Sequence, residues 1–524
     1  MPSLKMFGVE SPSQPQLILA LSGIFGAYVL SILHFYLRGS NAPLVGRRFF
    51  FEPEWLVGVR FIHNSAQMIQ YGYDKYKNTV FKVRRNDGII FVIPNSNLER
   101  LRNMPEEKIN GLEAHIKNLF GPYSTTEMML ESDLPTRVIQ QKLTPNLLAA
   151  VPKMKDELEY ALEVEVPNCQ DEWVSVQVFD LLCRIIARVS ARVFLGLVIC
   201  RNERWFEICM RYTENVHLLV MTMRMVPSYM HWFIAPLIPA FWRVRSILKE
   251  GKRFISPLVQ ERRAAEAENR QGYKQDNDLL QWMMDLGYPN EALPDKLAHR
   301  QLLMSLATTH TTGMAAAHVM YDLCAYPGYL EQIREELLSV LRSHGGWHKS
   351  IIPKMRKLDS FMKESQRLNP PALIAFNRIA RVPLELSDGT KLPPGTHFCM
   401  ASNAISRDVA HLPGGGSPDA FDPFRWQRLR DDPSDPENVH RYQFSTTDST
   451  SLHFGHGKFA CPGRFFASQL IKMILGHILL RYDLKYPEGQ GRPRNLVFDE
   501  NIYPDPKARM LMRRRKLSID EPFC

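Results

Sequence analysis

Apolar residues recur at helical spacing along most of this chain, and strand-like alternation is confined to short stretches. From Leu98 to about Leu341 the hydrophobic positions follow the three- and four-residue spacing of helices. Proline pairs and Pro-Gly steps predict where individual helices end, and they delimit long helices at Pro294 to Tyr326 and at Leu358 to Leu368. A further helix is predicted from Arg464 to Leu484. The pattern therefore predicts one large, mainly helical body.

Strands are predicted at only a few places. Residues 81–94 alternate around Asn86-Asp87-Gly88, which is typical of a hairpin turn. Short strands are expected at Val382 to Leu386 and at Lys391 to Met400. Ser402 to Thr450 is rich in Pro, Gly and Asp and shows little regular pattern. The fold class predicted is mainly α with small β-sheets (α+β).

The N-terminal region contains an uncharged run from Leu17 to Leu37, in which His34 alone is strongly polar and which is long enough to cross a bilayer as a helix. Arg38, Arg47 and Arg48 follow this run, so the positive-inside rule places the rest of the chain on the cytosolic side. A buried helix is the alternative. We expect a short N-terminal segment (1–16), a transmembrane anchor (17–37), a linker (38–58) and one large domain (59–524).

A second apolar stretch, Val216 to Trp242, is interrupted by Arg224, Pro227, Pro236 and Pro239 and is not expected to span a membrane. Its methionines and aromatic residues suit either core packing or contact with lipid, and both interpretations stay open.

Composition and charge narrow the class of protein. A chain of 524 residues with 45% hydrophobic and 23% charged residues is globular and can bury a large core. Its eight cysteines are scattered without a CxxC pair, which suits a reducing compartment and argues against a zinc site. The net charge is +10, yet no nucleic-acid-binding motif accompanies it. We therefore expect anionic lipid and an acidic protein partner, and no nucleic acid.

Candidate chemistry is concentrated in residues 454–463, the cysteine loop, which reads Phe-Gly-His-Gly-Lys-Phe-Ala-Cys-Pro-Gly. Cys461 stands before a predicted helix, whose free N–H groups favour the thiolate that binds iron. Gly457 and Gly463 permit close backbone approach, Lys458 offers a cation to an acidic group, and Phe454 would keep water from the sulfur. The pattern is typical of an axial haem ligand. The simpler interpretation is a glycine-rich turn with an inert, buried cysteine.

Two further motifs lie on predicted helices. Glu364 and Arg367 are three residues apart and share a helix face, which alone indicates only a solvated ion pair. Residues 307–313 of the long helix read Ala-Thr-Thr-His-Thr-Thr-Gly, and four threonines are poor helix formers. The Thr311 hydroxyl is expected to bond the Ala307 carbonyl four residues back and to open a groove.

Along the chain, residues 307–313 come first, Glu364 and Arg367 follow, and the cysteine loop comes last. These motifs in this chain order resemble those of the cytochrome P-450 superfamily, the haem-thiolate monooxygenases. The resemblance covers nearly all of the chain beyond the N-terminal segment and implies the cytochrome P-450 fold with haem b (iron protoporphyrin IX) on Cys461. It implies a buried structural triad of Glu364, Arg367 and Arg425, the last in a segment that ends at Trp426. The resemblance also implies that Thr311 helps to deliver protons and that Arg378 holds a haem propionate; the alternative for Arg378 is a surface strand arginine.

Several positions depart from the usual pattern. His310 stands where the family usually has Asp or Glu; it either relays protons or only lines the pocket, and both interpretations stay open. Lys458 replaces the commoner arginine and keeps the charge without the bidentate fork. On an early helix, Pro135 and Gln140 occupy the positions where the family usually binds a propionate, and Arg137 and Lys142 are not assigned that role.

The resemblance implies a single-pass protein of the endoplasmic reticulum membrane whose catalytic domain faces the cytosol. It is closest to fungal microsomal members of secondary metabolism, and a terpenoid-type hydrophobic substrate is expected. Molecular oxygen is the oxidant, and electrons come from NADPH through a separate reductase, because no Gly-rich nucleotide fingerprint is present. Lys458 and Arg464 mark the expected docking surface for the reductase.

The expected substrate pocket is apolar and includes Leu306, Leu373, Ile374 and Phe376. Two alternatives remain at this stage: a haem-thiolate isomerase or dehydratase that acts on a peroxide without a reductase, and a non-enzymatic haem sensor. The motifs specify neither the substrate, nor the carbon that is oxidised, nor the number of oxidation steps.

Overall fold

The computed structural model describes residues 22, 26, 42–268, 276–348 and 350–516. The anchor predicted at 17–37 therefore lies outside the described residues, apart from Ser22 and Gly26. Among the residues that are described, none of the helices has the length and apolar character needed to traverse a bilayer.

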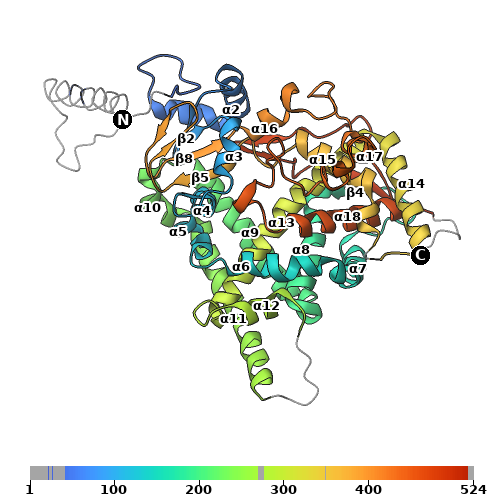
Figure 1. Cartoon of the computed structure of the whole chain (residues 1–524). Helices are drawn as coiled ribbons and strands as arrows, with labels where there is room; N and C mark the ends of the chain where they lie inside the picture. The colour runs from blue at the N-terminus through green and yellow to red at the C-terminus, as the bar shows by residue number, and fades with distance from the viewer. Residues whose placement is uncertain (1–21, 23–25, 27–41, 269–275, 349, 517–524) are drawn as a thin grey trace, which may run out of the picture.

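Helices dominate the described chain, and α13 (Pro294–Ala325) runs through its centre (Figure 1). This 32-residue helix packs against α8, α9, α11 and α15, and it confirms the long helix predicted from the sequence. The other helices of ten or more residues are α2 (Glu54–Lys75), α7 (Thr144–Glu165), α8 (Val178–Cys200), α9 (Glu203–Arg224), α11 (Pro239–Ala267), α14 (Pro327–His344), α15 (Arg356–Leu368) and α18 (Arg464–Arg481).

Shorter helices connect these long ones. They are α3 (Leu98–Leu101), α4 (Gly111–Asn118), α5 (Gly121–Ser124), α6 (Leu134–Val138), α10 (His231–Ile234), α12 (Leu279–Leu286), α16 (Ser402–Ser406) and α17 (Arg425–Asp431). Most of the stretch from 402 to 450 is irregular, as its Pro, Gly and Asp content predicts.

The main sheet has five strands in the order β1-β2-β8-β5-β3. Its first two strands form the predicted hairpin, with Arg85 paired to Gly88 across the turn. A three-stranded sheet has the order β4-β12-β9, and two-stranded sheets join β6 to β7 and β10 to β11. The strands are β1 (Phe81–Arg85), β2 (Gly88–Val92), β3 (Ile109–Asn110), β4 (Val174–Gln177), β5 (Ala375–Ala380), β6 (Leu384–Glu385), β7 (Lys391–Leu392), β8 (His397–Met400), β9 (Tyr482–Lys485), β10 (Leu496–Phe498), β11 (Asn501–Tyr503) and β12 (Arg509–Arg514).

Three predicted boundaries are wrong. Helix α2 begins at Glu54, inside the range expected to be linker, because its apolar face packs on the first hairpin. Helix α18 ends at Arg481, and the residues expected to extend it enter strand β9. The strand expected at 391–400 is two strands in different sheets, because Pro393, Pro394 and Gly395 form a turn between them.

Two large apolar cores are present in the described chain. The larger is built by α7, α8, α9, α13, α14 and α18, and the second lies between α2 and the five-stranded sheet. The cysteine loop touches both regions. Its Phe454 packs on the first core, and its Phe459 ring lies 4.7 Å from the guanidinium of Arg378 on β5.

Candidate functional site

Backbone hydrogen bonds fix the cysteine loop. The Cys461 N–H donates to the Phe454 carbonyl at 2.7 Å, and the Lys458 N–H donates to the Arg102 carbonyl at 3.1 Å. Gly457 has φ +70°, and a Cβ there would lie 2.3 Å from the Arg102 carbonyl oxygen. Only glycine fits this close approach to the neighbouring chain.

Gly463 is different, because nothing within the protein requires a glycine there. Its φ is −84°, and a Cβ built on it would meet no atom within 4 Å. Cys461, two residues earlier, is partly exposed. The space next to Gly463 is therefore not filled by atoms of the described chain.

Burial raises the pKa of the Cys461 thiol, although the N–H groups of Gly463 and Arg464 and the Arg464 charge act in the opposite direction. The N–H groups at the start of α18 thus favour the thiolate, as expected, but burial has the larger effect on the pKa. Binding of a metal ion would convert the thiol to a thiolate, because metal binding displaces the proton from a thiol.

The middle of α13 has an open face. Ala307 and Thr311 are exposed although this helix is central, and the Thr311 hydroxyl donates to the Ala307 carbonyl at 2.7 Å as predicted. Thr309 and Thr312 are buried. Residues 294–325 form one continuous helix without an internal kink, so the exposure of Ala307 and Thr311 does not come from a break in α13.

His310 is directed away from its own helix backbone. Its ring stacks on that of His217 from α9 at 5.9 Å and meets Phe179 from α8 edge-on at 5.8 Å. Its Nδ1 has no hydrogen-bond partner in the described chain. Burial lowers the pKa of His310 to about 4, with a smaller effect from His217, so the ring is neutral at pH 7.

Arg378 is buried on β5 without a counter-charge. Its guanidinium donates to the carbonyls of Asn377 at 2.8 Å and His456 at 3.3 Å, and it lies 3.9 Å from the Phe376 ring centre. No carboxylate of the described residues forms an ion pair with it, and its Nε has no partner. Burial lowers the pKa of Arg378 to about 9. A buried cation of this kind is costly and is completed by an anion.

The other basic candidates have partners elsewhere. Lys458 is half exposed, and its Nζ lies 3.2 Å from Glu106, which is equally exposed. Arg137 pairs with Asp133 at 2.9 Å and with Glu291 at 2.6 Å. The structure therefore presents Arg378, rather than Lys458, as the buried cation of the site.

Glu364, Arg367 and Arg425 come together, but their contacts are unequal. Arg367 binds the fully buried Glu364 carboxylate with two bonds, of 2.7 and 2.9 Å. Arg425 is 3.8 Å from the same carboxylate and donates mainly to the carbonyls of Pro413 and Gly415. The cluster thus fastens α15 to the irregular 402–450 segment.

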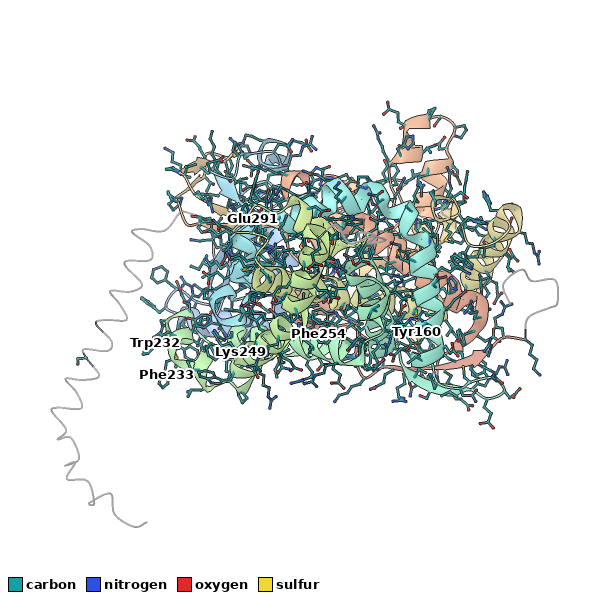
Figure 2. All side chains as sticks on the ribbon, turned by 90° about the horizontal axis from the view of Figure 1, so that it is seen from below. Tyr160, Trp232, Phe233, Lys249, Phe254 and Glu291 are labelled. Atoms are coloured by element: carbon teal, nitrogen blue, oxygen red, sulfur yellow. The ribbon has the colours of Figure 1, made fainter. Side chains whose placement is uncertain are left out.

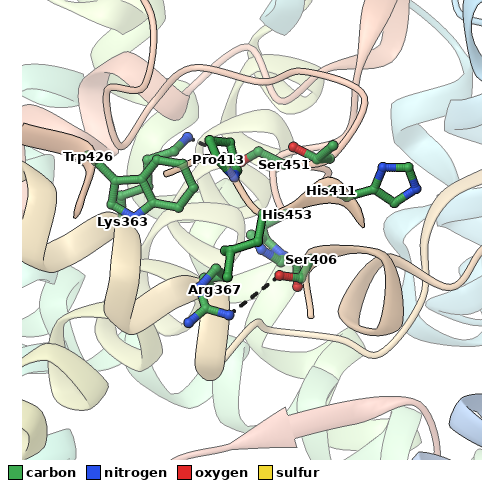
Figure 3. A pocket seen from close by; sticks show the side chains of 10 residues that line it. Lys363, Arg367, Ser406, His411, Pro413, Trp426, Ser451 and His453 are labelled. Atoms are coloured by element: carbon green, nitrogen blue, oxygen red, sulfur yellow. Dashed lines mark hydrogen bonds between the residues drawn. The ribbon is translucent and has the colours of Figure 1, made fainter. Parts of the chain in front are cut away.

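Trp426 is a member of this cluster that sequence reasoning did not assign. Its indole N–H donates to Glu364 at 3.0 Å. A buried tryptophan usually needs a hydrogen-bond acceptor for its N–H group. The tryptophan directly after Arg425 was therefore the sequence signal for this contact. Figure 3 shows Trp426 in a small pocket with Arg367, Ser406 and His453, where Arg367 reaches the Ser406 carbonyl at 3.4 Å.

The comparisons with known proteins agree with this geometry. The family model for Cytochrome P450 matches residues 68–512. This chain belongs to the cytochrome P450 family. Its relatives include a cytochrome P450 monooxygenase of Emericella nidulans, 53% identical over 97% of this chain and 94% of its own length. Others are a cytochrome P450 monooxygenase of Penicillium canescens (44%, covering 98% and 97%) and an ent-kaurene oxidase of Gibberella fujikuroi (41%, covering 94% and 97%).

As a P450 monooxygenase, the protein is an oxidoreductase that uses haem iron. Three observations fit this cofactor to the residues present. Arg378 lacks an anion, the space next to Gly463, two residues after Cys461, is open, and Ala307 and Thr311 on α13 are exposed. Haem propionates are anions and could pair with Arg378. The planar haem ring also needs open space beside the residue that binds its iron.

His115 is a second residue of this P450 that sequence reasoning missed. A Cβ on Gly111 would lie 2.8 Å from the Arg378 guanidinium, and His115 follows one turn later on the same face of α4. Its side chain is accessible, yet loss of solvation lowers the pKa of His115. In the sequence, His115 belongs to a helix that mixes polar and apolar residues, and no pattern distinguishes it from its neighbours.

The expected apolar pocket residues are mostly core residues. Leu373, Ile374 and Phe376 are each 2% exposed and pack around the five-stranded sheet, whereas Leu306 is only partly buried. Phe376 lies on β5 and the other two residues immediately precede this strand, so packing against the sheet encloses their side chains. Leu306 remains the apolar candidate on α13.

Proposed function

We propose that this P450 oxidises a terpenoid-type hydrophobic small molecule, with molecular oxygen and with electrons from NADPH through a separate reductase. The observation that carries the proposal is the exposed Thr311 side chain, which lies next to exposed Ala307 in the middle of a central helix. The terpenoid class is supported by the relative named ent-kaurene oxidase. The expected substrate is a neutral, largely apolar molecule.

Each residue has a separate task in this proposal. Bound haem supplies the activation of dioxygen and the insertion of one oxygen atom into a C–H bond. Cys461 would hold the iron as a thiolate, and Phe454 would help to keep water from the sulfur. Arg378 binds a propionate. Thr311, with water, passes protons at its hydroxyl, which is anchored by its bond to Ala307.

Membrane association is supported by an aromatic surface around α10. Tyr229, Trp232, Phe233, Leu237 and Trp242 are between 54% and 75% exposed, and Figure 2 shows Trp232 and Phe233 at the edge of the molecule. Exposed aromatic and aliphatic side chains in this number favour a lipid surface. We therefore include in the proposal a single-pass anchor in the endoplasmic reticulum membrane, with the catalytic domain facing the cytosol. Lys458 and Arg464 remain the proposed reductase side.

The ligand assignment is tested by the carbon monoxide spectrum of the reduced holoprotein. The wild-type protein is expected to show the red-shifted Soret band of thiolate ligation, and Cys461→Ala is expected to lose it. Cys324→Ala, a partly buried cysteine on α13, is the matched control and should retain the band. A normal band in Cys461→Ala would refute the assignment.

The reaction is tested in microsomes that contain this protein and a P450 reductase. With NADPH and oxygen, a panel of diterpene hydrocarbons is expected to yield products heavier by one oxygen atom. Oxygen-18 gas labels the inserted atom and separates oxidation from hydration. Products that form from a peroxide substrate without NADPH would instead support an isomerase or dehydratase.

A further inference from the structure

Four elements bring a small polar cluster to the border of the open face of α13. His217 on α9 stacks on His310 at 5.9 Å, with 22° between the ring planes. Tyr503 on β11 meets His217 edge-on at 5.5 Å, and Phe179 on α8 meets His310 edge-on at 5.8 Å. His310 follows Leu306 by one turn and directly precedes Thr311. The stacked histidines therefore lie beside the exposed residues Ala307 and Thr311 of α13.

The two imidazoles keep their hydrogen-bonding capacity. Within the described part of the chain, neither histidine ring has a hydrogen bond, and the buried Nδ1 of His310 lacks any partner. Among the described residues, the Tyr503 hydroxyl has one hydrogen-bond partner, the Met221 sulfur at 3.5 Å, which is a weak acceptor. Partly enclosed polar groups without partners are costly, and a ligand that supplies them is therefore favoured.

The charge state of the cluster limits the chemistry of that ligand. Burial lowers the pKa of both His217 and His310, so each neutral ring offers one donor and one acceptor. Burial also raises the pKa of Tyr503, whose hydroxyl keeps its proton. The charge of Arg224 acts on Tyr503 but is already paired with Asp499 and Glu500, so a buried carboxylate would lack an offsetting charge. A hydroxyl or carbonyl oxygen matches these groups instead.

We propose that His217, His310 and Tyr503 form a substrate-recognition site for a neutral oxygen, a hydroxyl or carbonyl, carried by the hydrophobic substrate at a position other than the carbon that is oxidised. This proposal rests on the proposed function and narrows it. The enzyme then prefers a terpenoid that already contains one oxygen over the bare hydrocarbon. His310 contributes to binding, while proton delivery belongs to Thr311.

The test compares three probes with one tricyclic skeleton: abietadiene, its alcohol abietol and abietic acid. Isothermal titration calorimetry of the holoprotein in detergent gives each dissociation constant. The alcohol is expected to bind about two- to tenfold more tightly than the hydrocarbon, the gain typical of one neutral hydrogen bond. Equal affinity for the two would overturn the proposal. Tightest binding of the acid would overturn the assignment to a neutral oxygen.

Variants separate recognition from folding. In His217→Leu the ratio of the two affinities should fall to about one, whereas His217→Gln, which keeps a donor and an acceptor, should retain most of it. Tyr503→Phe removes one hydroxyl and keeps the ring packing, so it provides an independent test where His217→Leu does not fold. Leu218→Ala, an exposed neighbour on α9, is the control and should leave the ratio unchanged. An unchanged ratio in both His217→Leu and Tyr503→Phe would overturn the site.

The two proposals fail in different ways. Calorimetry reports binding whether or not the iron is thiolate-bound or reduced. Loss of alcohol preference with a normal carbon monoxide band would reject the recognition site alone. A normal band in Cys461→Ala would reject the ligand assignment, while the affinity ratios would still stand as measured.

Discussion

The site has a cysteine side, made of the cysteine loop, Arg378 and the Glu364 cluster, and a threonine side, made of Thr311, His310 and His217. The two sides are built by different means. On the cysteine side, the Glu364 carboxylate accepts bonds from Arg367, Trp426 and the Asp422 N–H. On the threonine side, His217 and His310 contact each other only through ring faces. The cysteine side is therefore held by hydrogen bonds around one buried carboxylate, although the Nε atoms of Arg378 and Arg425 have no hydrogen-bond partner among the described residues, whereas the threonine side is held by ring contacts.

This contrast teaches where the chain can vary. A buried carboxylate with several donors tolerates few changes, because removing any partner leaves an uncompensated charge. Ring contacts and unpaired nitrogens can be exchanged for other side chains at smaller cost. We infer that the cysteine side secures the cofactor, while the threonine side determines which substrate is accepted.

The strongest way to break the contrast is to remove the charge at the centre of the cysteine side. Glu364→Gln leaves Arg367 buried without a counter-charge, and we expect a loss of about 3–5 kcal/mol in the free energy of unfolding. Urea unfolding and haem content per protein measure the effect. Glu385→Gln, at an exposed position on β6, is the control. An unchanged unfolding midpoint would show that the cluster is not essential to the cysteine side.

Arg378 tests whether the cysteine side needs its unpaired cation. Arg378→Ala removes the expected partner of a propionate, and haem should leave about tenfold to a hundredfold faster, as expected for a lost hydrogen bond to a charged group. Transfer of haem to apomyoglobin measures the rate. Arg381→Ala, an exposed arginine paired with Glu113, should behave like the wild-type protein. Equal rates for the two variants would remove Arg378 from the site.

Removal of the Thr311 hydroxyl tests the function of the threonine side. Thr311→Val keeps the shape of the side chain, and we expect the ratio of product to NADPH consumed to fall by about tenfold or more, because proton delivery is lost. Thr222→Val is a matched control, since its hydroxyl makes the same bond to the carbonyl four residues back, on α9. A normal ratio in Thr311→Val would transfer the proton task to another group.

The sequence predicted the cysteine side better than the threonine side, and for a physical reason. The cysteine loop and the Glu364 helix are local patterns, in which glycine, proline and charge spacing decide the geometry. Arg378 could be placed by position, but its lack of a counter-charge depends on residues far apart in the chain. The His217 and His310 contact joins two helices, and no local pattern encodes such a pairing. Likewise, the enclosure of Leu373 and Phe376 follows from sheet packing, which spacing does not reveal.

The smallest effect concerns His318, a fully enclosed histidine further along α13, beyond the open face. Burial, with a smaller effect from Arg492, lowers the pKa of His318 to about 3, whereas an unfolded histidine titrates near pH 6.5. The unfolded state therefore binds more protons between these values, so stability falls as the pH drops through 6.5. From pH 8 to pH 6 this residue should account for about 1 kcal/mol, which His318→Leu would remove from the pH dependence of urea unfolding. His63→Leu, on the exposed side of α2, should keep the full dependence. Equal slopes in the two variants would mean that α13 admits solvent at His318, and the open face would then extend along more of the helix than Ala307 and Thr311.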